Sequence, residues 1–161
     1  MNDRLPLKPF QASMTQMVLP NDTNPLGNLL GGQLMHWIDL VAAIAAARHA
    51  KHICVTASVD ELNFLQPIRS GQVVTLLASV NRVFTTSMEV GVKVLSEDLL
   101  TGDIRHANTA YLTFVALDRD GRPVRVPPVG RETETEERRY RAASVRREER
   151  LKRREKLVHQ P

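Results

Sequence analysis

Residues 31–50 read GGQLMHWIDLVAAIAAARHA, and this stretch decides the fold. Beyond its two glycines, the segment 34–50 is apolar at most positions, with six alanines and no proline. Apolar residues around most of the circumference indicate a helix that is buried on most sides. Arg48 and His49 stand at its C-terminal end, where positive charge favours the helix dipole. The stretch therefore predicts a long central helix.

The segments around this helix are β-prone. Apolar residues recur there at every second position, as Val74, Leu76 and Ala78 show, and this period is typical of strands. One such segment precedes the helix and four follow it: residues 14–19, 53–64, 72–83, 87–97 and 104–117. Short turns between the later segments predict antiparallel neighbours. Strands this long suit a sheet that curls, so we predict an α+β fold in which a curved, largely antiparallel sheet wraps around the central helix.

The positive charge of the chain lies in its C-terminal tail. Residues 1–130 hold 11 Lys and Arg against 11 Asp and Glu, whereas residues 131–161 hold 11 against 7, and 11 − 7 = 4 equals the net charge of +4. We therefore predict one domain at residues 1–130 and a basic, charged, helical and solvated extension at residues 131–161. A neutral domain and a tail with interleaved acids argue against a nucleic acid partner.

Other features bear on the cellular compartment. The first residues, MNDRLPLKPFQASM, lack the pattern of a secretory signal. The apolar run 37–47 is interrupted by Asp39 and is shorter than the roughly 20 residues that span a bilayer. A single cysteine, Cys54, excludes an internal disulfide and suits a reducing compartment. These features predict a cytoplasmic protein without a membrane partner.

Asp39 is the one carboxylate between Asp22 and Asp60, and it lies within the apolar helix. A charge in such a place is costly unless it is paired or hydrated. Two readings stay open. Asp39 can bond a buried backbone group or face solvent locally, or it can serve as the general base or nucleophile of a hydrolytic site.

Gly31 and Gly32 mark the start of the helix, where unpaired N–H groups and the helix dipole favour developing negative charge. They can polarise a carbonyl group, although a glycine pair is also simply a flexible entry. Asn24, in the preceding turn, can orient a water or a carbonyl, or be an ordinary turn residue. Gly31 and Asp39 are eight positions apart, so they lie about 12 Å apart on one helix. We therefore expect them to act on one reacting centre only from different subunits.

Four parts of the sequence together resemble the signature of one enzyme family. They are DTNPLGN at 22–28, GGQLM at 31–35 followed by Asp39, FLQPI at 64–68 and TSMEVGV at 86–92. This combination resembles the hotdog-fold acyl-CoA thioesterases, in the branch of bacterial broad-specificity acyl-CoA thioesterases and brain-type acyl-CoA hydrolases. The resemblance covers roughly residues 12–120 and implies the hotdog fold, a sheet wrapped around a long central helix.

The resemblance also implies an activity and a site. Enzymes of this family hydrolyse acyl-CoA to a free fatty acid and CoA, without a metal or an organic cofactor. Asn24 and Asp39 match the family's catalytic Asn and Asp, which meet across a dimer interface, and such dimers commonly assemble into hexamers. Thr86 and Ser87 match CoA contacts, or are an ordinary turn or solvent-facing pair. The sequence has no phosphate loop, so Arg82 and the arginines of the tail are the residues expected to bind the CoA phosphates. Asp39 would activate water, or attack directly to give an anhydride.

Two other functions use the same fold. A non-catalytic acyl-CoA-sensing module would contact DNA through the basic tail, but such a sensor has no need of Asp39. A hydratase or dehydratase would pair a His with a carboxylate, and His36 lies three positions before Asp39, but the motif that contains Asn24 favours hydrolysis. The sequence has no Gly-x-Ser-x-Gly elbow and no third ligand near His49 and His52, which argues against a serine hydrolase and a metal site.

Overall fold

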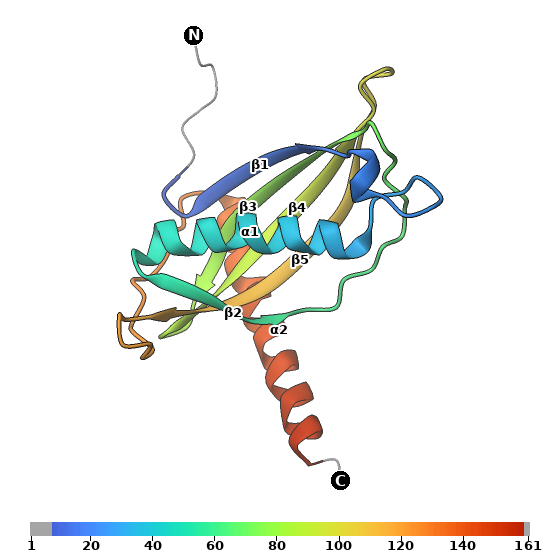
Figure 1. Cartoon of the computed structure of the whole chain (residues 1–161). Helices are drawn as coiled ribbons and strands as arrows, with labels where there is room; N and C mark the ends of the chain where they lie inside the picture. The colour runs from blue at the N-terminus through green and yellow to red at the C-terminus, as the bar shows by residue number, and fades with distance from the viewer. Residues whose placement is uncertain (1–7, 160–161) are drawn as a thin grey trace.

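The computed structural model describes residues 8–159, which form five strands, two α-helices and a short 3-10 helix (Figure 1). In chain order these are β1 (Gln11–Met17), η1 (Pro20–Asp22), α1 (Gly31–Ala50), β2 (Ile53–Val59), β3 (Val73–Val83), β4 (Ser87–Glu97), β5 (Ile104–Leu117) and α2 (Glu134–Val158). Among these described residues, no helix is long and apolar enough to cross a membrane.

The five strands form one sheet in the order β1-β3-β4-β5-β2, and every neighbouring pair is antiparallel. The long strands β3, β4 and β5 make up its middle, and β1 and β2 are its edges. The sheet curls around α1, which runs across its concave face (Figure 1). The predicted architecture, a curved antiparallel sheet around a central helix, is therefore confirmed.

The core lies between α1 and the concave face of the sheet. Leu34, Ile38 and Val41 of α1 are almost fully buried, and Ala42 and Ala45 add small side chains that let the helix lie close to the strands. The strand residues that point inward alternate with outward-pointing ones along β3, β4 and β5. Those that are almost fully buried include Val74, Leu76, Val90, Val92, Leu112 and Phe114.

The opposite side of α1 is open in the single chain. Leu40 and Ile44 lie on this side and are each 42% exposed, and Met35, at the other flank of the helix, is 41% exposed. The prediction that the helix is buried on most sides is confirmed where α1 faces the sheet, and these three residues stay partly exposed in the single chain. An apolar surface of this kind is typical of a contact with another chain.

β2 ends at Val59, short of the predicted strand end at residue 64. Its pairing with β5 closes at Asp60, whose N–H donates to the Tyr111 carbonyl at 2.9 Å. The chain then leaves the sheet, yet Leu62 still packs against the core. The apolar pattern therefore continues beyond the strand, which explains why the sequence predicts too long an element.

α2 begins with a capping box, in which Thr133 and Glu136 each accept a hydrogen bond from the other's backbone N–H. Its first half lies on the convex face of the sheet, where Ala143 is fully buried, and its second half projects beyond the sheet (Figure 1). The tail was predicted to be solvated, and this is wrong for the first half. The reason is that Ala143 and Tyr140 give this part of the helix a side that packs on the sheet.

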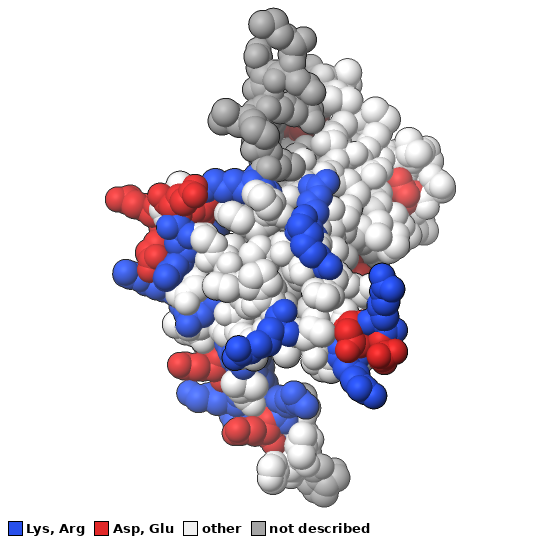
Figure 2. Space-filling model, turned by 90° about the vertical axis from the view of Figure 1, so that its left-hand side faces the viewer, with Lys and Arg blue, Asp and Glu red and all other residues white. Residues whose placement is uncertain are grey.

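Charge along the projecting end of α2 is mixed. Figure 2 shows Lys and Arg side chains interleaved with Asp and Glu side chains over the lower end of the molecule. Such interleaving is typical of a solvated helix rather than of a surface that binds nucleic acid.

Candidate active site

Asp39 lies in the middle of α1 and is half-buried. Its Oδ1 atom accepts a hydrogen bond from the Thr56 hydroxyl of β2 at 2.6 Å. The sequence left open a hydrogen bond between Asp39 and a buried backbone group, but the partner of Asp39 in the structure is the Thr56 side chain. A carboxylate has two oxygens, so one is oriented by Thr56 while the other can bind a water or a substrate.

A hollow of about 340 Å³ opens beside this pair. Asp39 and Thr56 form a polar part of its wall, and His36 also lines it. The rest of the lining is glycine and apolar side chains: Gly32, Met35, Ile38, Val59, Leu62 and Leu112. A concave site with an apolar wall and a few polar groups is the usual form of a small-molecule site. This one suits a molecule with an apolar chain and one reactive polar group.

The two glycines at the start of α1 have different surroundings. A side chain on Gly31 would meet the Phe64 ring at 3.4 Å, so Gly31 packs under an aromatic ring. Gly32 has open space at the corresponding position and lines the same hollow as Asp39, two turns along the helix. The N-cap residue is Leu30, which provides no side-chain cap. The first amides of α1 can therefore polarise a bound carbonyl.

Asn24 organises the loop before α1. Its side-chain oxygen accepts hydrogen bonds from the backbone N–H of Leu26 at 3.0 Å and of Asn28 at 3.2 Å. The loop turns at Gly27, whose φ of +76° favours glycine. The Asn24 side-chain nitrogen takes no part in these bonds and remains a donor. Asn24 is not among the residues that line the hollow beside Asp39 in the single chain.

The residues expected to contact CoA lie in two places. Arg82 points toward α2, where it donates to the Ser144 hydroxyl and lies 4.0 Å from the centre of the Tyr140 ring. Its guanidinium group therefore holds α2 against the sheet. Ser87 instead lines a separate hollow of about 710 Å³ between α2 and the β2 edge of the sheet. The arginines that line this hollow are Arg147, Arg150, Arg153 and Arg154.

Sequence reasoning missed Thr56. The residue is one of several hydroxyl side chains in a β-prone run, and a lone threonine in a strand carries no distinct signal. Thr56 becomes important only because the edge strand passes beside Asp39 of the helix. The sequence also gave no indication of the role of Glu89, which is fully buried on the side of β4 that faces α2. Among the described residues, no group of His, Cys, Asp and Glu side chains could hold a metal ion.

Comparisons with known proteins show that this chain is similar to thioester hydrolases. The family model of the thioesterase superfamily matches residues 26–102. YkhA of Bacillus subtilis, which is named an uncharacterized acyl-CoA thioester hydrolase, is 52% identical over 122 residues, or 76% of this chain and 71% of the relative. The chain belongs to the acyl-CoA thioester hydrolases of the thioesterase superfamily.

Two solved structures are similar over nearly the whole chain. An acyl-CoA hydrolase from Staphylococcus aureus, solved in complex with butyryl-CoA, CoA and CoA disulfide, is 40% identical with a TM-score of 0.87, covering 92% of this chain and 91% of that one. Variants of that enzyme in which an aspartate, an asparagine or a threonine is changed to alanine have also been solved. A hexameric acyl-CoA thioesterase is 41% identical with a TM-score of 0.87, covering 92% of this chain and 96% of that one. The predicted family, hotdog fold and hydrolysis of acyl-CoA thioesters are thus confirmed.

Proposed function

We propose that this protein hydrolyses acyl-CoA thioesters at a composite site, with Asp39 and Thr56 from one subunit and Asn24 from another. The observation that carries the proposal is the oriented Asp39 carboxylate, held by Thr56 at 2.6 Å in the wall of an apolar hollow. The residue types replaced in the Staphylococcus aureus variants, an aspartate, an asparagine and a threonine, are the same three types. The acyl chain of the substrate would occupy the apolar part of the hollow.

Asn24 and the start of α1 would bind the thioester carbonyl. The free side-chain nitrogen of Asn24 and the first amides of α1, near Gly31 and Gly32, are donors for the oxyanion that forms when the carbonyl carbon is attacked. Because Gly31 and Asp39 lie about 12 Å apart on one helix, one thioester reaches both kinds of group only between two subunits.

The surfaces that a second subunit would cover are present in the single chain. α1 exposes the apolar side chains of Met35, Leu40 and Ile44, and β2 is an edge strand whose Ile53 and Val55 are 64% and 42% exposed. Exposed apolar edge strands are usually covered in the assembled protein. We therefore propose a homo-oligomer built from dimers, with a trimer of dimers suggested by the hexameric relative.

Two routes are compatible with this geometry. In the first, Asp39 takes a proton from water, the water oxygen bonds to the acyl carbon, the carbon–sulfur bond breaks and the proton passes to the CoA thiolate. In the second, Asp39 bonds to the acyl carbon and displaces CoA, and water then hydrolyses the anhydride. A single turnover in heavy-oxygen water can separate the two routes, because heavy oxygen enters the Asp39 carboxylate only by the second.

The CoA phosphates would bind in the hollow between α2 and the β2 edge of the sheet. Ser87 lines it together with Arg147, Arg153 and Arg154, and guanidinium groups suit phosphate geometry. Thr86 lies in the β3–β4 turn, directly before Ser87, the first residue of β4, and is proposed to contact the same part of CoA. Arg82 would then contribute indirectly, because it holds the helix that carries these arginines.

The test is a free-thiol release assay on short, medium and long acyl-CoAs. We expect the Asp39→Asn variant to lose about 10³-fold in kcat, since it keeps the shape of Asp39 but neither accepts a proton nor attacks carbon. The control is Asp120→Asn, which changes an exposed acid in the turn after β5 and should leave kcat unchanged. Turnover retained by Asp39→Asn would contradict the proposed role.

A further inference from the structure

β2 carries Thr56, and this strand is held less firmly than the middle of the sheet. It pairs only with β5, and most of its seven residues are exposed. Its register with β5 shifts between Thr56 and Ser58, which is a β-bulge next to the residue that bonds Asp39. Bulges aim side chains at functional sites, but they also interrupt the ladder that holds a strand. The position of the Thr56 hydroxyl therefore depends on contacts beyond the ladder.

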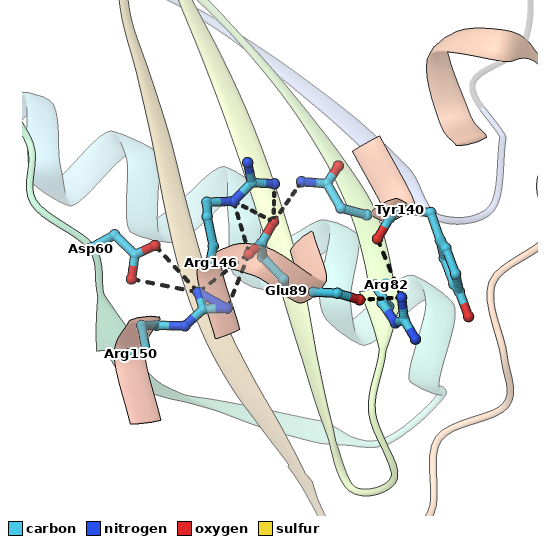
Figure 3. A network of polar contacts seen from close by, with 8 residues as sticks. Asp60, Arg82, Glu89, Tyr140, Arg146 and Arg150 are labelled. Carbon is cyan, nitrogen blue, oxygen red and sulfur yellow. Dashed lines mark hydrogen bonds and ion pairs between the residues drawn. The ribbon is translucent and has the colours of Figure 1, made fainter. Parts of the chain in front are cut away.

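One such contact is made directly after the strand. The Asp60 carboxylate forms an ion pair with Arg150 of α2 at 3.3 Å, and both side chains are largely buried, at 17% and 15% exposed. Arg150 at the same time bonds the Glu89 carboxylate of β4 at 3.0 Å (Figure 3). A single guanidinium group thus joins the end of the edge strand to the middle of the sheet.

Glu89, the partner of Arg150 in the middle of the sheet, is itself held in place by several contacts. It is fully buried, and its carboxylate also accepts hydrogen bonds from Arg146 at 2.7 Å and from the Asn81 side-chain nitrogen at 3.0 Å. Burial alone would lower the pKa of the Arg146 guanidinium, but its bonds to Glu89 raise this pKa, so Arg146 stays charged. Arg146 also stacks on the Tyr111 ring at 3.6 Å. Because Arg146 already holds Glu89, the distinct contribution of Arg150 is its contact with Asp60.

We propose that Arg150 is a positioning residue for hydrolysis, which acts through Asp60 to hold β2 so that the Thr56 hydroxyl meets Asp39. Glu89 forms an ion pair with Arg150, and Arg150 forms one with Asp60. Asp60 in turn stands directly after β2, four residues beyond Thr56, and Thr56 bonds Asp39. The first half of α2 is then part of the apparatus that sets the geometry of the site. This inference rests on the proposed role of the Asp39–Thr56 pair.

The experiment compares Arg150→Gln and Asp60→Asn with the wild type in kcat and KM for one acyl-CoA. We expect each variant to lose about 10²-fold in kcat, because misplacement of a catalytic group by roughly an ångström costs that much. KM should change by less than about threefold in Asp60→Asn, whereas Arg150→Gln should also raise KM, because Arg150 lines the hollow proposed for the CoA phosphates. Arg150→Lys, which keeps the charge, should recover part of the loss. The double variant should be no slower than either single variant, because both changes break the same link.

Two control variants distinguish loss of this contact from general effects on the helix or on folding. Arg141→Gln removes an arginine that is 79% exposed on the same helix and does not line the hollow proposed for the CoA phosphates. Among the described residues its ion pair is with Glu137, so this change should leave kcat unchanged. Asp60→Asn changes one oxygen to nitrogen and leaves the Glu89–Arg146 pair intact, so it tests the link even if Arg150→Gln does not fold. Wild-type kcat in folded Asp60→Asn, or losses that add up in the double variant, would overturn the inference.

The same assays separate this inference from the proposed function. If Asp39→Asn and Thr56→Val retain turnover, the site itself is assigned wrongly. If those two variants lose activity while Asp60→Asn keeps it, the site stands and only the role of Arg150 fails.

Discussion

The Thr56 hydroxyl donates a 2.6 Å hydrogen bond to Oδ1 of Asp39, and this contact joins the central helix to the edge strand. The bond holds one carboxylate oxygen and so gives the other a defined direction in the hollow. It also makes the geometry of the site depend on β2, a strand that the sheet holds from one side only.

Replacing Thr56 tests this relationship. The Thr56→Val variant keeps the shape of the side chain but removes the donor, and we expect kcat to fall by about 10²-fold because the carboxylate is no longer held. Thr56→Ser keeps the hydroxyl and should stay within several-fold of the wild type. Thiol release gives both rates. Equal kcat in the Val variant and the wild type would show that the bond does not orient Asp39.

Much of the fold could be predicted because its elements have clear sequence periods. The apolar stretch at residues 34–50 and the alternation in residues 72–83 and 87–97 correspond to α1, β3 and β4 with small shifts at the ends. The errors have a common cause. Periodicity reports which side of an element is apolar but not what covers it, so the open side of α1 and the packed half of α2 were not predicted.

The candidate site was only partly predictable. Asp39 could be found because a carboxylate in an apolar helix is conspicuous in the sequence. Thr56 and Glu89 could not be found, because their partners come from other elements of the fold. The expected phosphate contact at Arg82 stays a prediction, and the structure gives this residue a contact with α2 that the sequence did not indicate.

Asp60 should make stability depend on pH. Burial raises the pKa of its carboxyl above the ordinary 3.8, although Arg150 acts to lower it. A carboxyl whose pKa is raised on folding holds its proton more tightly in the folded state. Its contribution to the free energy of unfolding therefore declines as pH rises through the range between its unfolded-state pKa and its folded-state pKa. The Asp60→Asn variant lacks this titration. We therefore expect the free energy of unfolding of the variant, relative to the wild type, to increase as pH rises from about 3 to about 6.

Urea unfolding followed by Trp37 fluorescence measures this difference at each pH. At pH values where Asp60 is ionised in both the folded and the unfolded state, the lost ion pair with Arg150 adds a constant amount to the difference in unfolding free energy between variant and wild type. Only the change of this difference with pH at lower pH therefore reports the titration of Asp60. A difference that does not change with pH would contradict the burial argument.

Gly91 should be needed for the bond between Asn81 and Glu89. A side chain at Gly91 would come within 2.8 Å of the Asn81 side-chain nitrogen, which donates to the buried Glu89 carboxylate. The Gly91→Ala variant must displace this donor, and we expect it to lower the free energy of unfolding by about 1–3 kcal/mol. Gly130→Ala is the control, because no atom of residues 8–159 lies within 4 Å of the added carbon. Equal stability of the Gly91 variant and the wild type would show that Asn81 can move without cost.

Cys54 should react slowly with thiol reagents. Burial raises the pKa of its thiol above the ordinary 9.0, and the thiolate is the reactive form. We expect a disulfide reagent at pH 8 to modify the folded protein more slowly than the urea-unfolded protein. Equal rates in the two states would contradict this prediction.

Each active site should take Asp39 from one subunit and Asn24 from another. Two inactive variants, Asn24→Ala and Asp39→Asn, can be co-expressed with different affinity tags so that they form mixed assemblies. If the site is composite, one of the two sites in each mixed dimer has both residues intact, and random mixing restores about a quarter of the wild-type activity. If both residues act within one subunit, every site lacks one of them and the mixture stays inactive. Thiol release from the mixed assemblies therefore decides between the two arrangements: we expect activity to be recovered, and an inactive mixture would rule out the composite site.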